Sequence, residues 1–167
     1  MQIKISTGGV LIFASSKGLM REYEEKEFDY DFPKGLMKLL AQQLIIALTT
    51  SDGDDLIIEF DDKNQKSADH FDKEIDQFIK LDSDDALLVM SHSDFTRICD
   101  NKNGDHTKFG WPINKIDGLQ KGTYHLNIKV QNVSKEFEKY AAYFRLILTI
   151  NKIEEIKSFN EVIEISN

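Results

Sequence analysis

The sequence contains one cysteine, two prolines and nine glycines, and each scarcity excludes something. A lone Cys99 cannot form an internal disulfide, which suits a reducing compartment. So few prolines and glycines leave no stretch with the composition of a flexible linker. No apolar run approaches the roughly 20 residues of a membrane-spanning helix, and the first 14 residues lack the charged start and apolar run of a secretory signal. We therefore expect a single domain over residues 1–167, located in the cytoplasm.

Basic residues are also in the minority. The chain has 21 Lys and Arg against 29 Asp and Glu, a formal net charge of −8. Phosphate groups need a basic binding face, so this balance argues against nucleic acid or an anionic membrane as a direct partner. It fits a basic protein partner, or it serves only solubility. Hydrophobic residues make up 41% of the chain, enough to build a core at this length.

The motifs of the common enzyme classes are missing. The sequence has no Gly-rich phosphate loop, no Gly-x-Ser-x-Gly and no His-Glu-x-x-His. Ser91–Asp94 (Ser-His-Ser-Asp) contains the residue types of a hydrolase triad, but we expect an extended segment in which neighbours point opposite ways. One Cys and four scattered His offer no zinc site, and Cys99 is expected to be a buried structural thiol. We predict no cofactor and no enzymatic activity; a hydrolase site assembled in space stays open.

What the sequence does contain is alternation of apolar and polar residues, the pattern of half-buried strands. It is clearest from Thr123 to Val130, and it also predicts strands at 3–5, 10–13, 28–32, 144–150 and 162–165, with a buried strand at 86–90. Helical spacing predicts a short helix within 35–43. Residues 71–79 fit a helix too, although 75–81 also fits a strand. Many short strands and one or two short helices predict a mainly β fold, an antiparallel β-sandwich, with a β-barrel as the alternative.

A β-hairpin is predicted where the apolar runs 44–48 and 56–60 flank an Asp-Gly turn. Carboxylates surround this turn, and carboxylates are the ligands that Ca²⁺ prefers. Their spacing matches no calcium loop, however, and turns favour Asp in any case. The segment 100–105 is likewise better explained by an Asn-Gly turn than by a calcium loop.

The candidate partner-binding residues are acidic, with one aromatic exception. They are Glu24, Glu25, Glu27, Asp29 and Asp31 in a first group, Asp52, Asp54 and Asp55 in a second, and Trp111. A dense carboxylate surface accelerates association with a basic partner, although charge on an edge strand also serves to prevent aggregation. An exposed Trp111 would be a natural anchor, because Trp is enriched among interface hot spots. We expect instead that Trp111, in a loop-like stretch, is buried and plugs the end of the sandwich.

Residues 116–130 resemble the competence protein J family of DNA-entry nuclease inhibitors and related bacterial immunity-type β-sandwich proteins. This segment combines a short apolar lead, a Lys-Gly turn and an alternating strand that starts at a Tyr. The runs at 44–62, 86–91 and 144–150 follow the family's order, while 98–115 resembles an insertion. The resemblance implies a non-enzymatic sandwich that blocks a nuclease or toxin, and it transfers no functional residue.

Two functions therefore compete. The first is an intracellular inhibitor or immunity-type protein that binds and blocks a basic toxin or nuclease. The alternative is a small-ligand or carbohydrate-binding β-sandwich module, with Ca²⁺ bound in the region 52–62.

Overall fold

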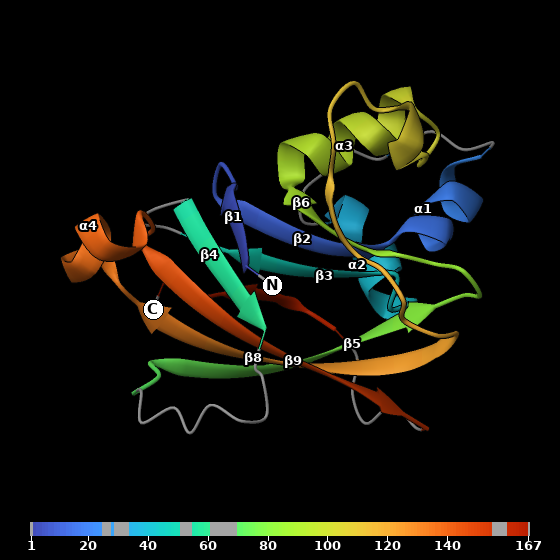
Figure 1. The fold of residues 1–167 in the computed structure, drawn as a ribbon. Coiled ribbons are helices and arrows are strands. Elements are labelled where there is room, and N and C mark those ends of the chain that lie inside the picture. The colour runs from blue at the N-terminus through green and yellow to red at the C-terminus, as the bar shows by residue number, and fades with distance from the viewer. Residues whose placement is uncertain are drawn as a thin grey trace.

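The computed structural model describes residues 2–24, 28, 34–50, 55–60, 70–154 and 160–166. Within these residues the strands form two five-stranded sheets (Figure 1). The first sheet has the order β1 (Gln2–Ser6), β4 (Asp55–Phe60), β9 (Phe144–Ile153), β8 (Gly122–Asn132), β5 (Lys73–Leu81). The second has the order β10 (Val162–Glu164), β3 (Ile45–Thr49), β2 (Val10–Ser15), β6 (Leu87–Ser91), β7 (Asn114–Ile116).

The helices are short and lie mostly on one side of the molecule. They are α1 (Ser16–Tyr23), α2 (Lys34–Ala41), α3 (His92–Asn101) and α4 (Phe137–Tyr140), with single 3-10 turns η1 (His106–Lys108) and η2 (Ser134–Glu136). In Figure 1, α1, α2 and α3 gather beside the second sheet, and α4 lies apart from them. No helix among the described residues is long and apolar enough to cross a membrane.

The main core lies between the two sheets and follows from the period of two. Along β8, Tyr124, Leu126, Ile128 and Val130 are buried and belong to this core, while the residues between them are partly exposed. The predicted β-sandwich is therefore confirmed. Its pairing is not purely antiparallel, because β4 runs parallel to β9 and β10 runs parallel to β3.

A second core separates the second sheet from α1, α2 and α3. It contains Leu19 of α1, Leu36 of α2 and Phe95 of α3, packed against Ile12 and Leu88 of the sheet. Both faces of β2, β3 and β6 are consequently covered, which explains why these strands are almost uninterrupted apolar runs. The first sheet has one face in the main core, and the polar residues that alternate with buried ones along β8 lie on its other face.

The predicted hairpin between the runs 44–48 and 56–60 is wrong. Both runs are strands, but β3 pairs with β2 and β10, whereas β4 pairs with β1 and β9 in the other sheet. Strands as apolar as these can be buried in either sheet, so local pattern does not choose their neighbours. The Asp-Gly turn itself lies outside the described residues.

Most other element predictions are confirmed: the strands at 3–5, 10–13, 86–90, 123–130, 144–150 and 162–165, and the helix within 35–43. The segment 75–81 belongs to strand β5, so its helical alternative is wrong. Phe28 is not in a strand, and the rest of the strand predicted at 28–32 lies outside the described residues. Helices α1, α3 and α4 were not predicted, so the described residues contain more helices than the one or two expected.

The Asn160 side chain connects the two sheets at one side of the sandwich. Asn160 Nδ2 donates to the carbonyls of Phe78 on β5 (2.6 Å) and Ile45 on β3 (2.8 Å). Asn160 Oδ1 accepts from the Phe78 N–H at 2.8 Å. The buried amide thus joins the edge strand of the first sheet to the second sheet, and it satisfies backbone groups that would otherwise lack partners.

Candidate protein-binding surface

Helix α3 begins at the segment that contains the residue types of a hydrolase triad. The Ser91 side chain accepts from the Asp94 N–H at 3.1 Å and donates to the Asp94 carboxylate at 3.0 Å. This is a helix N-cap, so the expectation of an extended segment here is wrong. His92 stacks on Phe95, and the four residues start a helix instead of forming a nucleophile–base relay. Phe95, Ile98 and Cys99 bury the inner face of α3 and leave Arg97 exposed.

The predicted burial of Cys99 is confirmed, since 1% of the residue is exposed. Burial raises the pKa of the Cys99 thiol, and the neighbouring Asp100 carboxylate raises it further. A thiol held in its protonated form is a poor nucleophile.

We call residues 102–116, which run from the end of α3 through β7, the Trp111 loop. Its first turn reverses the chain through Asn103 and Gly104, both with positive φ (52° and 75°). The N–H groups of Lys102 and Gly104 donate to the Ile98 carbonyl at 3.1 and 3.0 Å, which closes the end of α3. The Asn-Gly turn predicted for 100–105 is therefore confirmed.

This turn is pressed against α1. A Cβ atom on Gly104 would lie 2.3 Å from the carbonyl oxygen of Leu19 and 2.5 Å from its carbonyl carbon. Only glycine permits such an approach between two backbones. The position of α1 therefore fixes where the Trp111 loop begins.

We expect Gly104→Ala to lower the free energy of unfolding by about 3 kcal/mol, because it adds a backbone clash to the strain of a positive φ. Gly118→Ala is the matched control, since Gly118 has a φ of +82° and no atom within 4 Å of the added Cβ. The control should lose only about 1 kcal/mol. Urea denaturation measures both values, and equal losses would show that the approach to α1 is not tight.

Beyond the turn, Asp105 organises η1. One carboxylate oxygen accepts from the Thr107 hydroxyl (2.6 Å) and the Thr107 N–H (3.0 Å), and the other pairs with Lys108 at 3.2 Å. The Thr107 hydroxyl is the main reason why the pKa of Asp105 is below its usual value, and Lys108 acts in the same direction. The carboxylate is thus ionised at neutral pH and holds the loop in place.

Trp111 lies half-exposed at the tip of the loop, with 50% of the residue accessible to solvent. The expectation of a buried tryptophan is wrong. The Phe109 ring meets the indole edge-on, with 4.5 Å between centroids, and the Arg97 guanidinium lies 5.6 Å from the indole centroid. Edge-on aromatic contact and a stacked cation both restrict an exposed ring. We call Trp111, Phe109 and Arg97, whose contacts restrain the indole, the aromatic platform.

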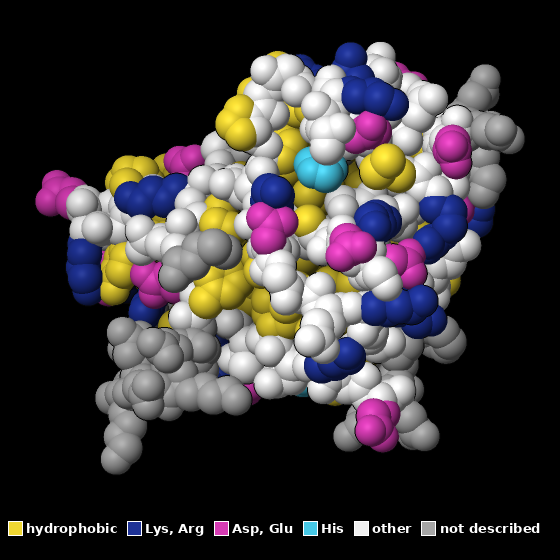
Figure 2. All heavy atoms as spheres, turned by 45° about the vertical axis from the view of Figure 1, so that its right-hand side comes forward, with side chains coloured by type: hydrophobic (Ala, Val, Ile, Leu, Met, Phe, Trp, Pro, Cys, Tyr) yellow, Lys and Arg dark blue, Asp and Glu magenta, His cyan; other side chains and the backbone are white. Residues whose placement is uncertain are grey.

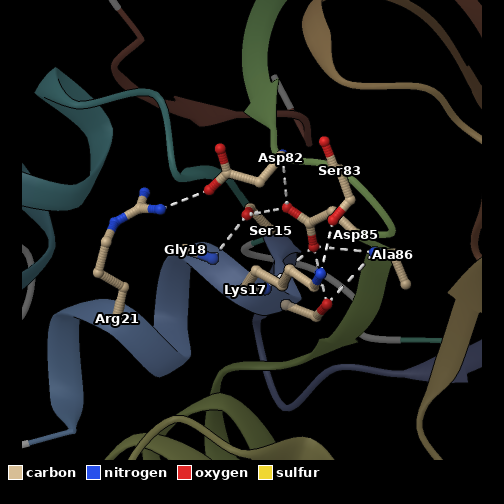
Figure 3. Close-up of polar contacts among 9 residues, drawn as sticks. Ser15, Lys17, Gly18, Arg21, Asp82, Ser83, Asp85 and Ala86 are labelled. Atoms are coloured by element: carbon tan, nitrogen blue, oxygen red, sulfur yellow. Dashed lines mark hydrogen bonds and ion pairs between the residues drawn. The ribbon is translucent and has the colours of Figure 1, made fainter.

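The platform depends on α1, and α1 is fixed at its start by Asp85 (Figure 3). The Asp85 carboxylate is 4% exposed and accepts five strong hydrogen bonds. Its donors are the hydroxyls of Ser15 (2.6 Å) and Ser16 (2.8 Å) and the N–H groups of Lys17 (3.0 Å), Asp82 (3.1 Å) and Ala86 (2.8 Å). Ser15 in turn caps α1 through the Gly18 N–H at 2.8 Å. One carboxylate thereby ties the β5–β6 connection to the first turn of α1.

Of the first predicted acidic group, only Glu24 lies within the described residues. It is exposed at the end of α1, and its carbonyl accepts from the Asn103 side chain at 3.5 Å. Glu24 also borders a shallow hollow shared with Met20, Asn103 and Lys108. The structure therefore brings Glu24 next to the Trp111 loop. Glu25, Glu27, Asp29 and Asp31 lie outside the described residues.

Of the second predicted group, Asp55 starts β4 and is partly exposed, in the first sheet. Asp52 and Asp54 lie outside the described residues, as does most of the region proposed to bind Ca²⁺. Among the residues that the structure describes, no three His, Cys, Asp or Glu side chains come close enough to hold a metal ion.

The surface around the loop is not dominated by one charge. Residues 92–121 carry five Lys or Arg and four Asp. Figure 2 looks onto the side of the molecule that contains α1 and the long connection after α3, and it shows acidic and basic side chains intermingled.

Three further exposed carboxylates, which sequence reasoning did not select, lie along one edge of the first sheet. Asp72, Glu74 and Asp76 are exposed at alternate positions in and before β5. Asn127 donates to both Glu74 (2.8 Å) and Asp76 (3.0 Å), and it is the main cause of the lowered pKa of Asp76. His125 adds a contact to Asp76 at 2.6 Å. The alternation of exposed residues 72, 74 and 76 with less exposed neighbours predicts a strand, but the helical interpretation of 71–79 competed with it.

Comparison with solved structures finds two matches. ComJ from Bacillus subtilis, described as an inhibitor of the DNA-degrading activity of NucA, aligns with a TM-score of 0.53 and 11% identity. The alignment covers 92% of this chain and 96% of ComJ. The two chains share a fold. The crocagin biosynthetic gene J product aligns at 9% identity and a TM-score of 0.45, over 89% of this chain and 94% of that one. No protein-family model and no curated protein matches the sequence.

The resemblance noted from the sequence is thus confirmed as a likeness to ComJ in fold. The segment 98–115, which looked like an insertion, covers the end of α3 and most of the Trp111 loop. The aromatic platform therefore lies in the part of the chain that the sequence resemblance did not predict.

Proposed function

We propose that this protein is a non-enzymatic inhibitor that binds and blocks a basic nuclease in the cytoplasm. The observation that carries the proposal is the exposed Trp111, braced by Phe109 and Arg97, on a fold shared with a nuclease inhibitor. An exposed but restrained tryptophan loses little conformational entropy when a partner covers it. We assign Trp111 the role of anchor in the interface.

Charge supplies the second part of the mechanism. A net charge of −8 attracts a basic partner at long range, whereas the Trp111 loop, which carries three Lys and one Asp, forms the contact. Glu24 lies beside the loop and begins the first acidic group. Glu24 is therefore the acidic residue that we place nearest to the partner.

Inhibition of DNA degradation tests the proposal directly. Purified protein is titrated against NucA and against each nuclease encoded in the source genome, with plasmid DNA as substrate. We expect one nuclease to lose activity at an equimolar ratio and to form a complex in size-exclusion chromatography. If a folded protein inhibits none of them, while calcium or a sugar raises its melting temperature, the ligand-binding alternative would replace the proposal.

The role of the acidic residues in association is tested with two variants, each of which removes three negative charges. Glu24→Gln, Glu25→Gln and Glu27→Gln together should slow association with the inhibited nuclease about tenfold at low salt. The matched control is Asp72→Asn, Glu74→Gln and Asp76→Asn, which removes the same charge from the outer face of the first sheet. At physiological salt the Debye length is about 8 Å, so the distant control should have the smaller effect. Stopped-flow kinetics measure both rates, and a larger effect of the control would move the interface to the first sheet.

A further inference from the structure

His106 lies at the base of the aromatic platform. It is the first residue of η1, and its carbonyl accepts from the Phe109 N–H at 3.2 Å. The Phe109 ring then contacts Trp111 edge-on. A displacement of the backbone at His106 is therefore transmitted to the indole through one hydrogen bond and one ring contact.

The imidazole of His106 is partly buried in an environment that suits only its neutral form. Its Nδ1 atom is buried and has no hydrogen-bond partner among the described residues. In a neutral ring Nδ1 can remain an unprotonated acceptor, whereas in the imidazolium it carries a buried N–H without an acceptor. A buried, unpaired donor that also carries charge is strongly disfavoured.

The charged groups around His106 do not reverse this preference. Burial is the largest influence and lowers the pKa of His106 below the ordinary histidine value. The carboxylates of Asp105, Asp117 and Asp85 act to raise it, and Lys115 acts to lower it. Three acidic groups from three different connections thus fail to compensate for the burial of the ring.

We propose that His106 is a pH-dependent latch of the Trp111 loop: the neutral ring keeps the loop packed, and protonation releases it. Opening of the loop on protonation is a property of the free protein. Its expected consequence, weaker partner binding at acid pH, rests on the proposed function.

The direction follows from linkage. When the loop opens, the ring reaches water and regains the ordinary histidine pKa of about 6.5. The open form then binds more protons than the closed form at pH values between the ordinary pKa and the lower pKa of the buried ring. The closed loop is therefore fully favoured above pH 6.5 and loses stability as the pH falls toward the lower pKa of the buried ring.

Trp111 is the only tryptophan, so its fluorescence reports on this loop alone. Between pH 7.5 and 5, we expect the acrylamide quenching constant of Trp111 to rise about twofold, as a half-exposed indole becomes fully exposed. The midpoint should lie below 6.5, and far-UV circular dichroism should stay constant. His106→Asn, which cannot be protonated, should remove the transition.

His92→Asn is the matched control, because burial also lowers the pKa of His92. His92 is the first residue of α3, whereas the Trp111 loop follows the last. This variant should keep the transition of the wild type. A flat quenching profile in the wild type, or an unchanged transition in His106→Asn, would overturn the latch.

A second measurement covers the case in which His106→Asn is misfolded. In wild-type protein, hydrogen exchange of residues 106–116, corrected for the intrinsic pH dependence, should accelerate at pH 5 relative to β8. Equal protection at both pH values would refute the latch, whatever partner the protein binds.

Discussion

Asp85→Asn should lower the free energy of unfolding by about 3 kcal/mol, an effect of similar size to that of Gly104→Ala and the largest we expect from a change of charge alone. The carboxylate accepts from five donors, three of them backbone N–H groups. An asparagine must point its own NH₂ group at one of the two sides. On the Oδ1 side it would face the N–H groups of Lys17 and Ala86, and on the Oδ2 side that of Asp82. At least one backbone N–H group then loses its acceptor.

Asp84→Asn is the matched control for this prediction. It makes the same chemical change one residue away, at an exposed position whose φ of 56° asparagine tolerates well. Chemical denaturation at pH 7 should show almost no effect of the control. A loss below about 1 kcal/mol for Asp85→Asn would mean that water replaces the missing bonds and that α1 is held by other contacts.

Trp111→Ala should weaken binding to the inhibited nuclease at least about 30-fold, equivalent to about 2 kcal/mol, as expected for a central tryptophan. The stability of the free protein should change by less than about 1 kcal/mol, because half of the side chain is already in water. The loss should appear mainly as faster dissociation, since the indole contributes contact area and not long-range attraction.

Phe137→Ala provides the control for aromatic truncation. Phe137 is 39% exposed on α4, which lies apart from α3 in Figure 1. Surface plasmon resonance should show unchanged dissociation for this variant. If Trp111→Ala bound like the wild type, the Trp111 loop would not be the interface, even if the protein does inhibit a nuclease.

The sequence predicts those parts of the fold that depend on local pattern. The alternation from Tyr124 to Val130 specifies a strand with one buried face, and β8 has that strand and that face. The runs Ile45–Leu48 and Leu56–Ile58 also announce strands, but both are apolar at consecutive positions. Partner choice for such strands depends on which sheet each one completes, and that is settled by contacts with distant segments such as β9 and β10.

The candidate site was predicted only in part, for a related reason. Trp111 was recognised as a possible anchor, but its exposure depends on the Gly104 turn resting on α1, a contact between segments 85 residues apart in numbering. Ser91 followed by Asp94 is an N-cap pattern that predicts the start of α3, but we considered the same residues only as a possible triad. Asp85 carried no signal at all, because its five donors come together only in the folded chain.

The bridge made by Asn160 has a consequence for biosynthesis. Its amide joins Phe78 of β5 to Ile45 of β3, and both strands leave the ribosome long before residue 160 does. Until residue 160 emerges, the edge of β5 presents unsatisfied backbone groups to solvent, next to a sheet that is already apolar on both faces. A nascent chain stalled just before this residue is therefore the form of the protein with the greatest tendency to pair with other strands, and the form that we expect chaperones to bind.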